Sequence, residues 1–397
     1  MMLNDNKWKK VKIGDIAEKI AMGPFGSNIK VSTFVESGVP IISGMHLKGF
    51  YLNEESYNYI TEEHAQRLKN SIVHSGDVIF THAGNVGQVA MIPENCQYPY
   101  YMISQRQFYL RCDKSKVLPE FIMYYLHSYE GQGKLLSNVS QVGVPSIAQP
   151  SSFLKTIEIP LPSLAEQSKI VSILASINKR IEMNTQINHN LEEQAKAIFK
   201  SWFVDFEPFN GKMPKSWLAK TLADVSKIGA GGDKPHCVSE IQTPEFQYPI
   251  YSNGLANDGL YGYASSAKIY EESITVSARG TIGFVCLRQE PYVPIVRLIT
   301  LIPNTCFVSA KYLYLYLKGI SISGTGTTQQ QLTVPDFQKT SIMVPDNDTM
   351  KRFTICADSI FEQIKHNAKE MRTLAQLRDT LLPKLMSGEI DVSEVEV

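Results

Sequence analysis

An internal repeat is the feature that most constrains the fold of this 397-residue chain. The segment DVIFTHAGNVGQVAMI (77–92) matches SITVSARGTIGFVCLR (273–288), and the two glycines of each segment coincide. Further on, FLKTIEIPLP (153–162) matches FQKTSIMVPD (337–346). A repeat on this scale predicts two related globular domains, each followed by the same exit segment.

Each exit segment leads into a long heptad pattern. Ser163 and Glu166 have the spacing of a capping box, which opens a helix of about 40 residues, on the order of 60 Å long. Apolar side chains then alternate in steps of four and three, which predicts two antiparallel coiled-coil helices. The seam residues of the first helix are Ile170, Leu174, Ile177, Ile181, Asn184, Leu191 and Ile198, and those of the second are Phe353, Ile360, Ile364, Asn367, Leu374 and Leu381.

Asn184 and Asn367 occupy the same seam position in the two helices. A polar residue in a coiled-coil seam lowers stability but can fix the register of the two helices. The alternative is a solvated break in the apolar stripe, and both interpretations stay open.

Short β-branched and aromatic runs, separated by Gly and Pro, fill the segments between the helices and predict mixed α/β domains. The predicted fold is therefore a tandem of α/β (mixed α+β) domains with a pseudo-two-fold internal repeat. Its predicted parts are a first domain at 1–162, a first helix at 163–207, a second domain at 208–345, a second helix at 346–387 and an acidic tail at 388–397.

Composition narrows the class of protein. The chain is 43% hydrophobic and has no run of about 18 apolar residues, so we expect a cytoplasmic protein with no membrane span. Its six cysteines lie far apart with no CxxC pair, which favours neither a zinc site nor a disulfide framework. With 39 basic and 39 acidic residues, the net charge of zero lacks the basic excess typical of nucleic-acid-binding proteins.

Motifs for catalysis are missing from the sequence. It contains no GxxxxGK[ST] loop, no HExxH and no Asn/Asp-Pro-Pro-aromatic tetrapeptide, and its eight histidines have no ligand spacing. We therefore expect no metal site and no enzymatic activity of the chain alone.

Several strings together resemble the specificity subunit of a Type I restriction-modification system. They are GPFGSNIK (23–30), GVPII (38–42), YPIYSNGLANDGLYGY (248–263) and, above all, IPLPSLAEQSKIVSIL (159–174). The resemblance covers nearly the whole chain. It implies target-recognition domains that read double-stranded DNA, and conserved helices that recruit two modification subunits. Restriction subunits that translocate DNA complete the implied complex, and S-adenosylmethionine, ATP and Mg²⁺ are expected in the partner subunits rather than in this chain.

Two similar but non-identical domains, held apart by rigid helices, can touch DNA at two places about one helical turn apart. Because the domains differ in sequence, the two half-sites can differ as well.

Candidate base-reading residues follow from side-chain chemistry, since Arg pairs well with guanine, and Asn or Gln with adenine. In the second domain the candidates are Arg279 and Thr281 at the glycine turn, and Thr327, Gln329 and Gln330 in a polar loop. In the first domain they are His82, taken as the counterpart of Arg279, with Asn85 at the glycine turn and Gln141 in the loop 138–146. Weaker candidates are Ser27, Asn28, Arg106 and Arg297. The turn glycines are expected to adopt positive φ.

Two other functions stay open: a stand-alone DNA methyltransferase or nuclease with a degenerate motif, and a coiled-coil scaffold that binds only proteins. An aromatic cluster of Phe199, Trp202, Phe203 and Phe206 is expected to hold a modification subunit, the alternative being that it packs under the second domain.

Overall fold

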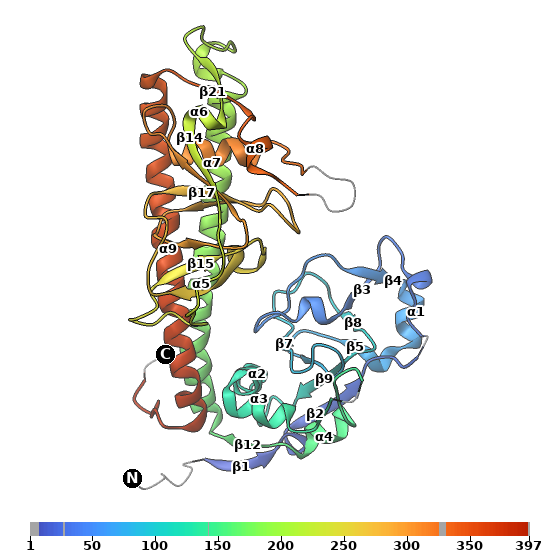
Figure 1. Cartoon of the computed structure of the whole chain (residues 1–397). Helices are drawn as coiled ribbons and strands as arrows, with labels where there is room; N and C mark the ends of the chain where they lie inside the picture. Colours follow the sequence, from blue (N-terminus) through green and yellow to red (C-terminus); the bar gives the residue numbers. More distant parts are fainter. Residues whose placement is uncertain (1–7, 27, 142, 325–330, 396–397) are drawn as a thin grey trace. The chain divides into compact units, whose positions relative to one another are not determined.

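The computed structural model describes residues 8–26, 28–141, 143–324 and 331–395. It divides into two compact units, one formed by Met1–Ile181 with Arg372–Val397 and the other by Glu182–Met371. The two longest helices, α5 (Leu164–Phe203, 40 residues) and α9 (Asn347–Ser387, 41 residues), each contribute one segment to both units (Figure 1). None of the described helices is long and apolar enough to cross a membrane.

The first unit contains two four-stranded sheets. The antiparallel sheet has the order β2-β9-β6-β7 and the mixed sheet the order β4-β3-β8-β5. Their strands are β2 (Ala17–Met22), β3 (Val39–Ile42), β4 (Asn58–Ile60), β5 (Ile72–Val73), β6 (Val78–Thr81), β7 (Val89–Met91), β8 (Tyr101–Ile103) and β9 (Gln107–Cys112). Strand β6 reads VIFT with all four residues buried, which suits a β-branched and aromatic run in a central strand.

Short helices and strands complete the first unit. They are β1 (Lys9–Lys12), α1 (Glu62–Arg67), α2 (Pro119–His127), α3 (Tyr129–Leu136), β10 (Val139–Ser140), β11 (Ser146–Ile147), α4 (Pro150–Thr156) and β12 (Glu158–Leu161). Strands β1 and β12 pair antiparallel, so the entry and exit of the domain lie side by side. The helix α2 and the antiparallel sheet share one apolar core with Ile170 and Leu174 of α5 and Leu385 of α9.

The second unit repeats this plan with different lengths. Its antiparallel sheet has the order β14-β20-β17-β18, its smaller sheet the order β16-β15-β19, and β13 pairs with β21 as β1 does with β12. The elements are β13 (Leu218–Thr221), α6 (Leu222–Val225), β14 (Ser226–Ala230), β15 (Tyr248–Tyr251), β16 (Leu260–Ala264), β17 (Ser273–Val276), β18 (Val285–Arg288), β19 (Val293–Pro294), β20 (Ile299–Pro303), α7 (Ala310–Gly319), α8 (Val334–Phe337) and β21 (Ser341–Val344). The tandem of mixed α/β domains predicted from the sequence is therefore confirmed.

Both long helices begin at a cap that also holds a tryptophan. At α5, Ser163 and Glu166 form the predicted capping box, and Trp8 Nε1 donates to Glu166 Oε1 over 3.3 Å. At α9, Asp346 accepts from the backbone N–H of Thr349, and its other oxygen accepts from Trp217 Nε1 over 3.2 Å. The first strand of each domain is thus tied to the helix that follows the domain.

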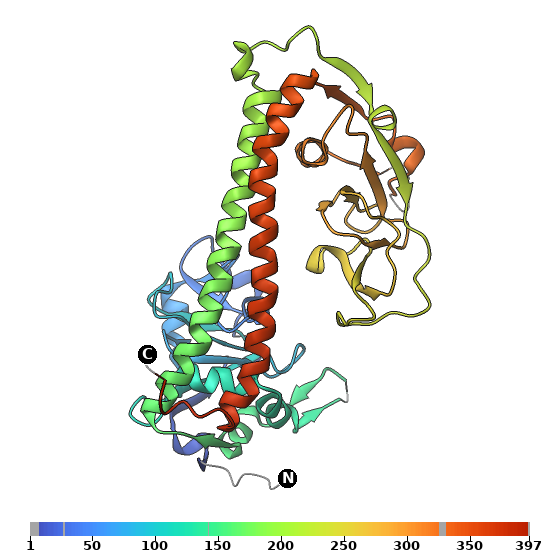
Figure 2. The same cartoon turned by 90° about the vertical axis from the view of Figure 1, so that its left-hand side faces the viewer.

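Within each unit the segments of α5 and α9 lie side by side and run in opposite directions (Figure 2). Arg378 Nη1 donates to Asn178 Oδ1 in the first unit, and Asn367 Nδ2 donates to Asn188 Oδ1 over 2.8 Å in the second. The predicted seam residues all lie away from solvent. Those that are buried are Ile170, Leu174, Ile177, Asn184, Phe353 and Asn367, and those that are half-buried are Ile181, Leu191, Ile198, Ile360, Ile364, Leu374 and Leu381.

The segments that follow the two helices fold back. After α5, Phe206 takes a left-handed conformation with φ of 55°, and its ring lies 5.7 Å from that of Trp217. After α9, Val392 is buried in the first core, and Lys169 Nζ donates to the carbonyl oxygen of Ser393 over 2.6 Å. The predicted acidic tail is therefore packed against the first unit through residue 395.

The aromatic cluster at the end of α5 packs inside the second unit. The ring of Phe203 lies 4.8 Å from Tyr312, 4.9 Å from Phe353 and 5.6 Å from Trp217. Phe199 is buried, whereas Trp202, Phe203 and Phe206 are half-buried, so the cluster packs largely under the second domain, as the alternative interpretation stated, and its docking role stays a prediction.

Candidate nucleic-acid interface

Three loops of the first unit meet at one edge of its antiparallel sheet. Thr81, the last residue of β6, pairs with Gln107, the first residue of β9, and Met22, the last residue of β2, pairs with Phe108. Since neighbouring strands run in opposite directions, the loops after β2 and β6 and the loop before β9 all emerge at this edge. The hairpin β10–β11 joins them, because the backbone N–H of Gly84 donates to the carbonyl oxygen of Pro145 over 3.0 Å.

The same edge recurs in the second unit. Ala230 at the end of β14 and Val276 at the end of β17 both pair with Ile299, the first residue of β20. The hydrogen bond from Gly23 to Gln107 in the first unit has its counterpart in the bond from Gly231 to Leu298, each 2.8 Å long. The repeat seen in the sequence therefore places the same three loops at the same edge.

The glycine turns at these edges need left-handed backbone. The φ angles are 85° at Gly84, 91° at Gly87, 69° at Gly280 and 83° at Gly283. A side chain at any of these positions would be strained. The predicted positive φ of the turn glycines is confirmed.

The match between the glycines of the two turns holds in the structure, but the pairing of His82 with Arg279 is wrong by one residue. The backbone N–H of Thr81 donates to the carbonyl oxygen of Gln88, as that of Ser277 does to Phe284. Thr81 therefore corresponds to Ser277, and Ala83, not His82, corresponds to Arg279. His82 is half-buried, and its Nε2 lies 3.1 Å from the carbonyl oxygen of Gln105.

Arg106 supplies the cation at the glycine turn of the first unit. Its side chain is exposed, and a Cβ atom added to Gly84 would lie 3.3 Å from its Nη1. In the second unit Arg279 itself stands at the turn, exposed, with Nη2 donating to Gln331 Oε1 over 3.2 Å. A guanidinium group thus lies at each turn, although it comes from a different loop in each unit.

Arg106 and Arg297 occupy equivalent positions in their turns. The residue after each arginine donates its backbone N–H to the carbonyl oxygen three residues earlier, Gln107 to Ser104 and Leu298 to Ile295. Arg297 is exposed, and the loop after β14 adds Lys234, whose Nζ contacts the hydroxyl of Tyr261 over 2.8 Å. Asp233 in the same loop is also exposed. Arg279, Arg297 and Lys234 thus supply positive charge at the second edge, and Asp233 supplies negative charge.

The other candidates lie on these loops or outside the described residues. Asn28, Asn85, Gln141 and Thr281 are exposed, and the carbonyl oxygen of Asn28 lies 2.7 Å from His64 Nε2. Ser27, Thr327, Gln329 and Gln330 lie outside the residues that the structure describes.

Two features of the first edge had no predicted role. Phe25, between Pro24 and Gly26 in the loop after β2, has 73% of its surface exposed. Behind the turns, Gln107 Nε2 donates to Thr81 Oγ1, Thr81 Oγ1 to Gln88 Oε1 and Gln88 Nε2 to the carbonyl oxygen of Gly44. An aromatic residue between Pro24 and Gly26 can be noticed in the sequence GPFGSNIK. The hydrogen-bonded chain of Gln107, Thr81 and Gln88 cannot, because it depends on contacts between distant loops.

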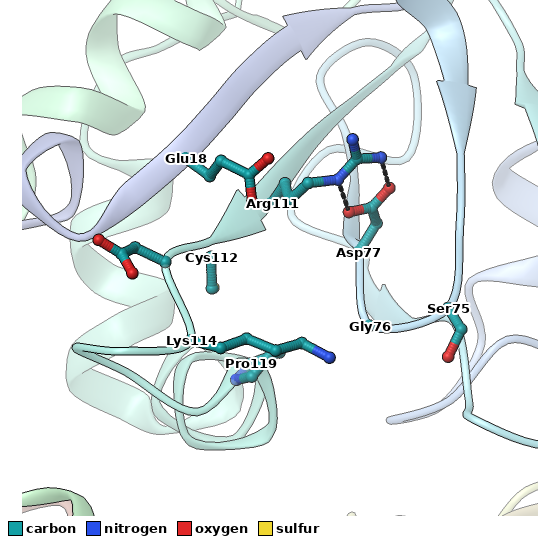
Figure 3. A pocket seen from close by; sticks show the side chains of 9 residues that line it. Glu18, Ser75, Gly76, Asp77, Arg111, Cys112, Lys114 and Pro119 are labelled. Atoms are coloured by element: carbon teal, nitrogen blue, oxygen red, sulfur yellow. Dashed lines mark hydrogen bonds and ion pairs between the residues drawn. The ribbon is translucent and has the colours of Figure 1, made fainter.

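A cavity of about 300 Å³ lies near the opposite edge of the same sheet, where β9 ends and β6 begins (Figure 3). Arg111 on its wall forms a two-point ion pair with Asp77, at 2.8 Å from Nε and 2.6 Å from Nη2. Burial raises the pKa of the Cys112 thiol to about 12, so the thiol is protonated at neutral pH.

Among the described residues, no group of three His, Cys, Asp or Glu side chains is placed to hold a metal ion.

Comparison with known proteins accounts for the two related units. The model of the Type I restriction modification DNA specificity domain matches residues 5–193 and 214–370. The chain belongs to this family. The two matched ranges begin near Trp8 and Trp217, so each globular domain carries one DNA specificity domain together with part of the helix that follows it.

Relatives in the DNA specificity family align along nearly the whole chain. The Type I restriction enzyme MjaIX specificity subunit of Methanocaldococcus jannaschii is 28% identical, with 98% of this chain and 94% of the relative covered. The Type I restriction enzyme HindI specificity subunit of Haemophilus influenzae is 25% identical, with 96% and 99% covered. The crystal structure of a Type-I restriction-modification system S subunit from M. genitalium has the same fold, with a TM-score of 0.58 at 17% identity over 97% of this chain and 98% of that chain. The resemblance to specificity subunits is confirmed.

Proposed function

We propose that each unit reads one half of a bipartite double-stranded DNA target for a type I restriction-modification complex. The observation that carries this proposal is the recurrence of one loop edge in both units, built on equivalent hydrogen bonds but with different side chains. Equivalent frameworks with Ala83 in one turn and Arg279 in the other suit two half-sites of different sequence.

The side chains on each edge match the chemistry of DNA. Arg106, Arg279 and Arg297 offer guanidinium groups to guanine or phosphate oxygens, and Asn28, Asn85 and Gln141 offer amides to adenine. Phe25 offers an exposed apolar ring that can contact a thymine methyl group in the major groove. His82, Thr281 and the candidates Ser27, Thr327, Gln329 and Gln330 remain proposed contacts on the basis of residue type and loop position.

The long helices are proposed to set the distance between half-sites and to bind two modification subunits. Their exposed apolar side chains are more accessible to a partner than the aromatic cluster around Phe203, which is buried or half-buried. These side chains are Met183, Ile187, Ile355 and Leu377. Restriction subunits would join the complex through the modification subunits, and S-adenosylmethionine, ATP and Mg²⁺ would act in the partners, in the cytoplasm. The chain itself is proposed to be non-catalytic.

A domain exchange tests the proposed function. Residues 8–161 would be replaced by the matching domain of a relative, so that β1 and β12 are exchanged as a pair. Mapping methylated motifs in cells should then show one half of the target changed and the other half intact, because base contacts lie within a unit. A simultaneous change of both halves would contradict modular reading.

The alternative of a stand-alone enzyme is tested with the purified chain. Incubation with DNA and S-adenosylmethionine, or with DNA and Mg²⁺, should give neither methylation nor cleavage until a modification subunit is added. Salt-dependent DNA binding by that reconstituted complex separates DNA recognition from a scaffold that binds only proteins.

A further inference from the structure

The side chain of Asn253 bridges the two turns that carry arginines in the second unit. Its Nδ2 donates to the carbonyl oxygen of Val296 over 2.7 Å, and its Oδ1 accepts from the backbone N–H of Ala278, also over 2.7 Å. Ala278 directly precedes Arg279, and Val296 directly precedes Arg297. One amide therefore contacts the backbone beside both arginines.

The turn at Val296 and Arg297 is in a conformation that these residues avoid when unsupported. Their φ angles are 53° and 59°, and a β-branched residue in this left-handed region is a clear outlier. Its backbone is held by bonds from Val296 N–H to Gly232 and from Arg297 N–H to Gly231, of 2.9 and 3.0 Å. Strained backbone of this kind persists only where its surroundings enforce it, and it concentrates at functional sites.

The first unit joins the counterparts of these turns directly. The backbone N–H of His82 donates to the carbonyl oxygen of Arg106 over 2.9 Å, and His82 Nε2 lies 3.1 Å from the carbonyl oxygen of Gln105. Asn253 corresponds to Gly44, because Ile295 N–H donates to Tyr251 as Ser104 N–H donates to Ile42. A Cβ atom added to Gly44 would lie 2.8 Å from Gln88 Oε1, so the Gln88 amide fills the space that Asn253 occupies in the other unit. Gln88 in turn corresponds to Phe284, which has no amide.

We propose that Asn253 is a positioning residue for base recognition by the second unit. The amide sets the relative placement of the two turns, so that Arg279 and Arg297 meet the same half-site together. This inference rests on the proposed reading of one half-site by each unit.

The test uses the complex of the full chain with its modification subunit and duplexes carrying the mapped target. Asn253→Ala should weaken binding about 5- to 150-fold, the range for one lost base contact, and should broaden base preference in the second half-site alone. Gln88→Ala, in the first unit, is the control and should leave base preference in the second half-site unchanged. Asn253→Asp keeps the acceptor for Ala278 but places a carboxylate oxygen against the carbonyl oxygen of Val296, so it should weaken binding at least as much as Asn253→Ala.

A double variant distinguishes positioning from simple loss of folding. In the Asn253→Ala background, Arg297→Ala should cause less further loss than in the wild type, because the placement of Arg297 is already impaired. Equal loss in both backgrounds, or broadened preference in both half-sites, would overturn the proposed role. If the wild-type complex shows no half-site preference at all, the proposed function fails instead, whatever the variants do.

Discussion

The polar layer between the long helices allows a quantitative test of the packing described above. Asn367 has only 4% of its surface exposed, and its amide accepts from Gln363 Nε2 over 2.7 Å and donates to Asn188 Oδ1 over 2.8 Å. Asn188 is half-buried and also donates to the carbonyl oxygen of Ile364 over 3.3 Å. All four residues belong to the second unit.

Replacing one partner should cost more than replacing both. In Asn367→Leu, two hydrogen bonds are lost and Asn188 Oδ1 is left without its donor, which together cost about 3 kcal/mol. Apolar burial contributes about 2 kcal/mol in return, so the free energy of unfolding should fall by about 1 kcal/mol. In Asn188→Leu, the buried Asn367 amide loses its acceptor and the apolar gain is smaller, so we expect a loss of about 2 kcal/mol. The double variant removes both amides and should be about as stable as the wild type, a coupling of about 3 kcal/mol.

Denaturant unfolding followed by tryptophan fluorescence measures these effects. In a Trp8→Phe background the remaining tryptophans, Trp202 and Trp217, both report on the second unit. Gln186→Leu, at an exposed position of the same helix as Asn188, is the control. Its effect on the free energy of unfolding should add to that of Asn367→Leu without coupling. If the double variant loses as much stability as the two single variants combined, the hydrogen bond between Asn188 and Asn367 does not carry the energy assigned to it.

Three further predictions concern DNA affinity, target spacing and pH. Phe25→Ala should weaken binding to the first half-site by about 1–3 kcal/mol in fluorescence anisotropy, the range for one lost contact to a base pair. Tyr129→Ala removes an aromatic side chain with 93% of its surface exposed on α3 and should have no effect; equal effects would refute a contact specific to Phe25. Insertion of four residues beside Asn184 and beside Asn367 lengthens each helix by ~6 Å. At ~3.4 Å per base pair, the gap in the methylated motif should grow by roughly one to two base pairs, and an unchanged gap in an active complex would show that the helices do not set it. Burial lowers the pKa of His127, whose Nε2 lies 2.8 Å from the carbonyl oxygen of Val89. The neutral form therefore contributes stability to the first unit above the unfolded pKa of about 6.5. This contribution is lost as the pH falls below that value and through the lowered pKa of the folded state. Denaturation between pH 5 and 8 should show a shallower slope for His127→Leu, with a residual slope from His46, whose pKa burial also lowers; identical slopes would contradict this assignment.

Much of the architecture follows from patterns local to the chain. The heptads after Ser163 and Asp346 predict two long helices because side-chain periodicity determines which face of a helix is apolar. The glycine turns of the two domains are predicted by the need for positive φ at Gly84 and Gly280. The tandem of related domains is evident from the repeat itself, since similar sequences adopt similar folds.

The arrangement of side chains at the loop edges depends on tertiary structure. Arg106 is far in sequence from Gly84, and only the pairing of β6 with β9 brings its guanidinium group to the glycine turn. The Phe203 cluster has the composition of a docking surface, but whether it is covered depends on Tyr312 and Phe353, which are more than 100 residues away.

Asn253 shows the same distinction most clearly. In the sequence it is one polar residue in a loop rich in Gly and Asn, where a turn-forming role is the ordinary expectation. Its two hydrogen bonds join backbone groups 25 and 43 residues away. Periodicity and turn propensity act over a few residues, whereas these bonds exist only after the sheets have assembled. Patterns along the chain therefore predict the helices, strands and turns, but not which side chains share an edge.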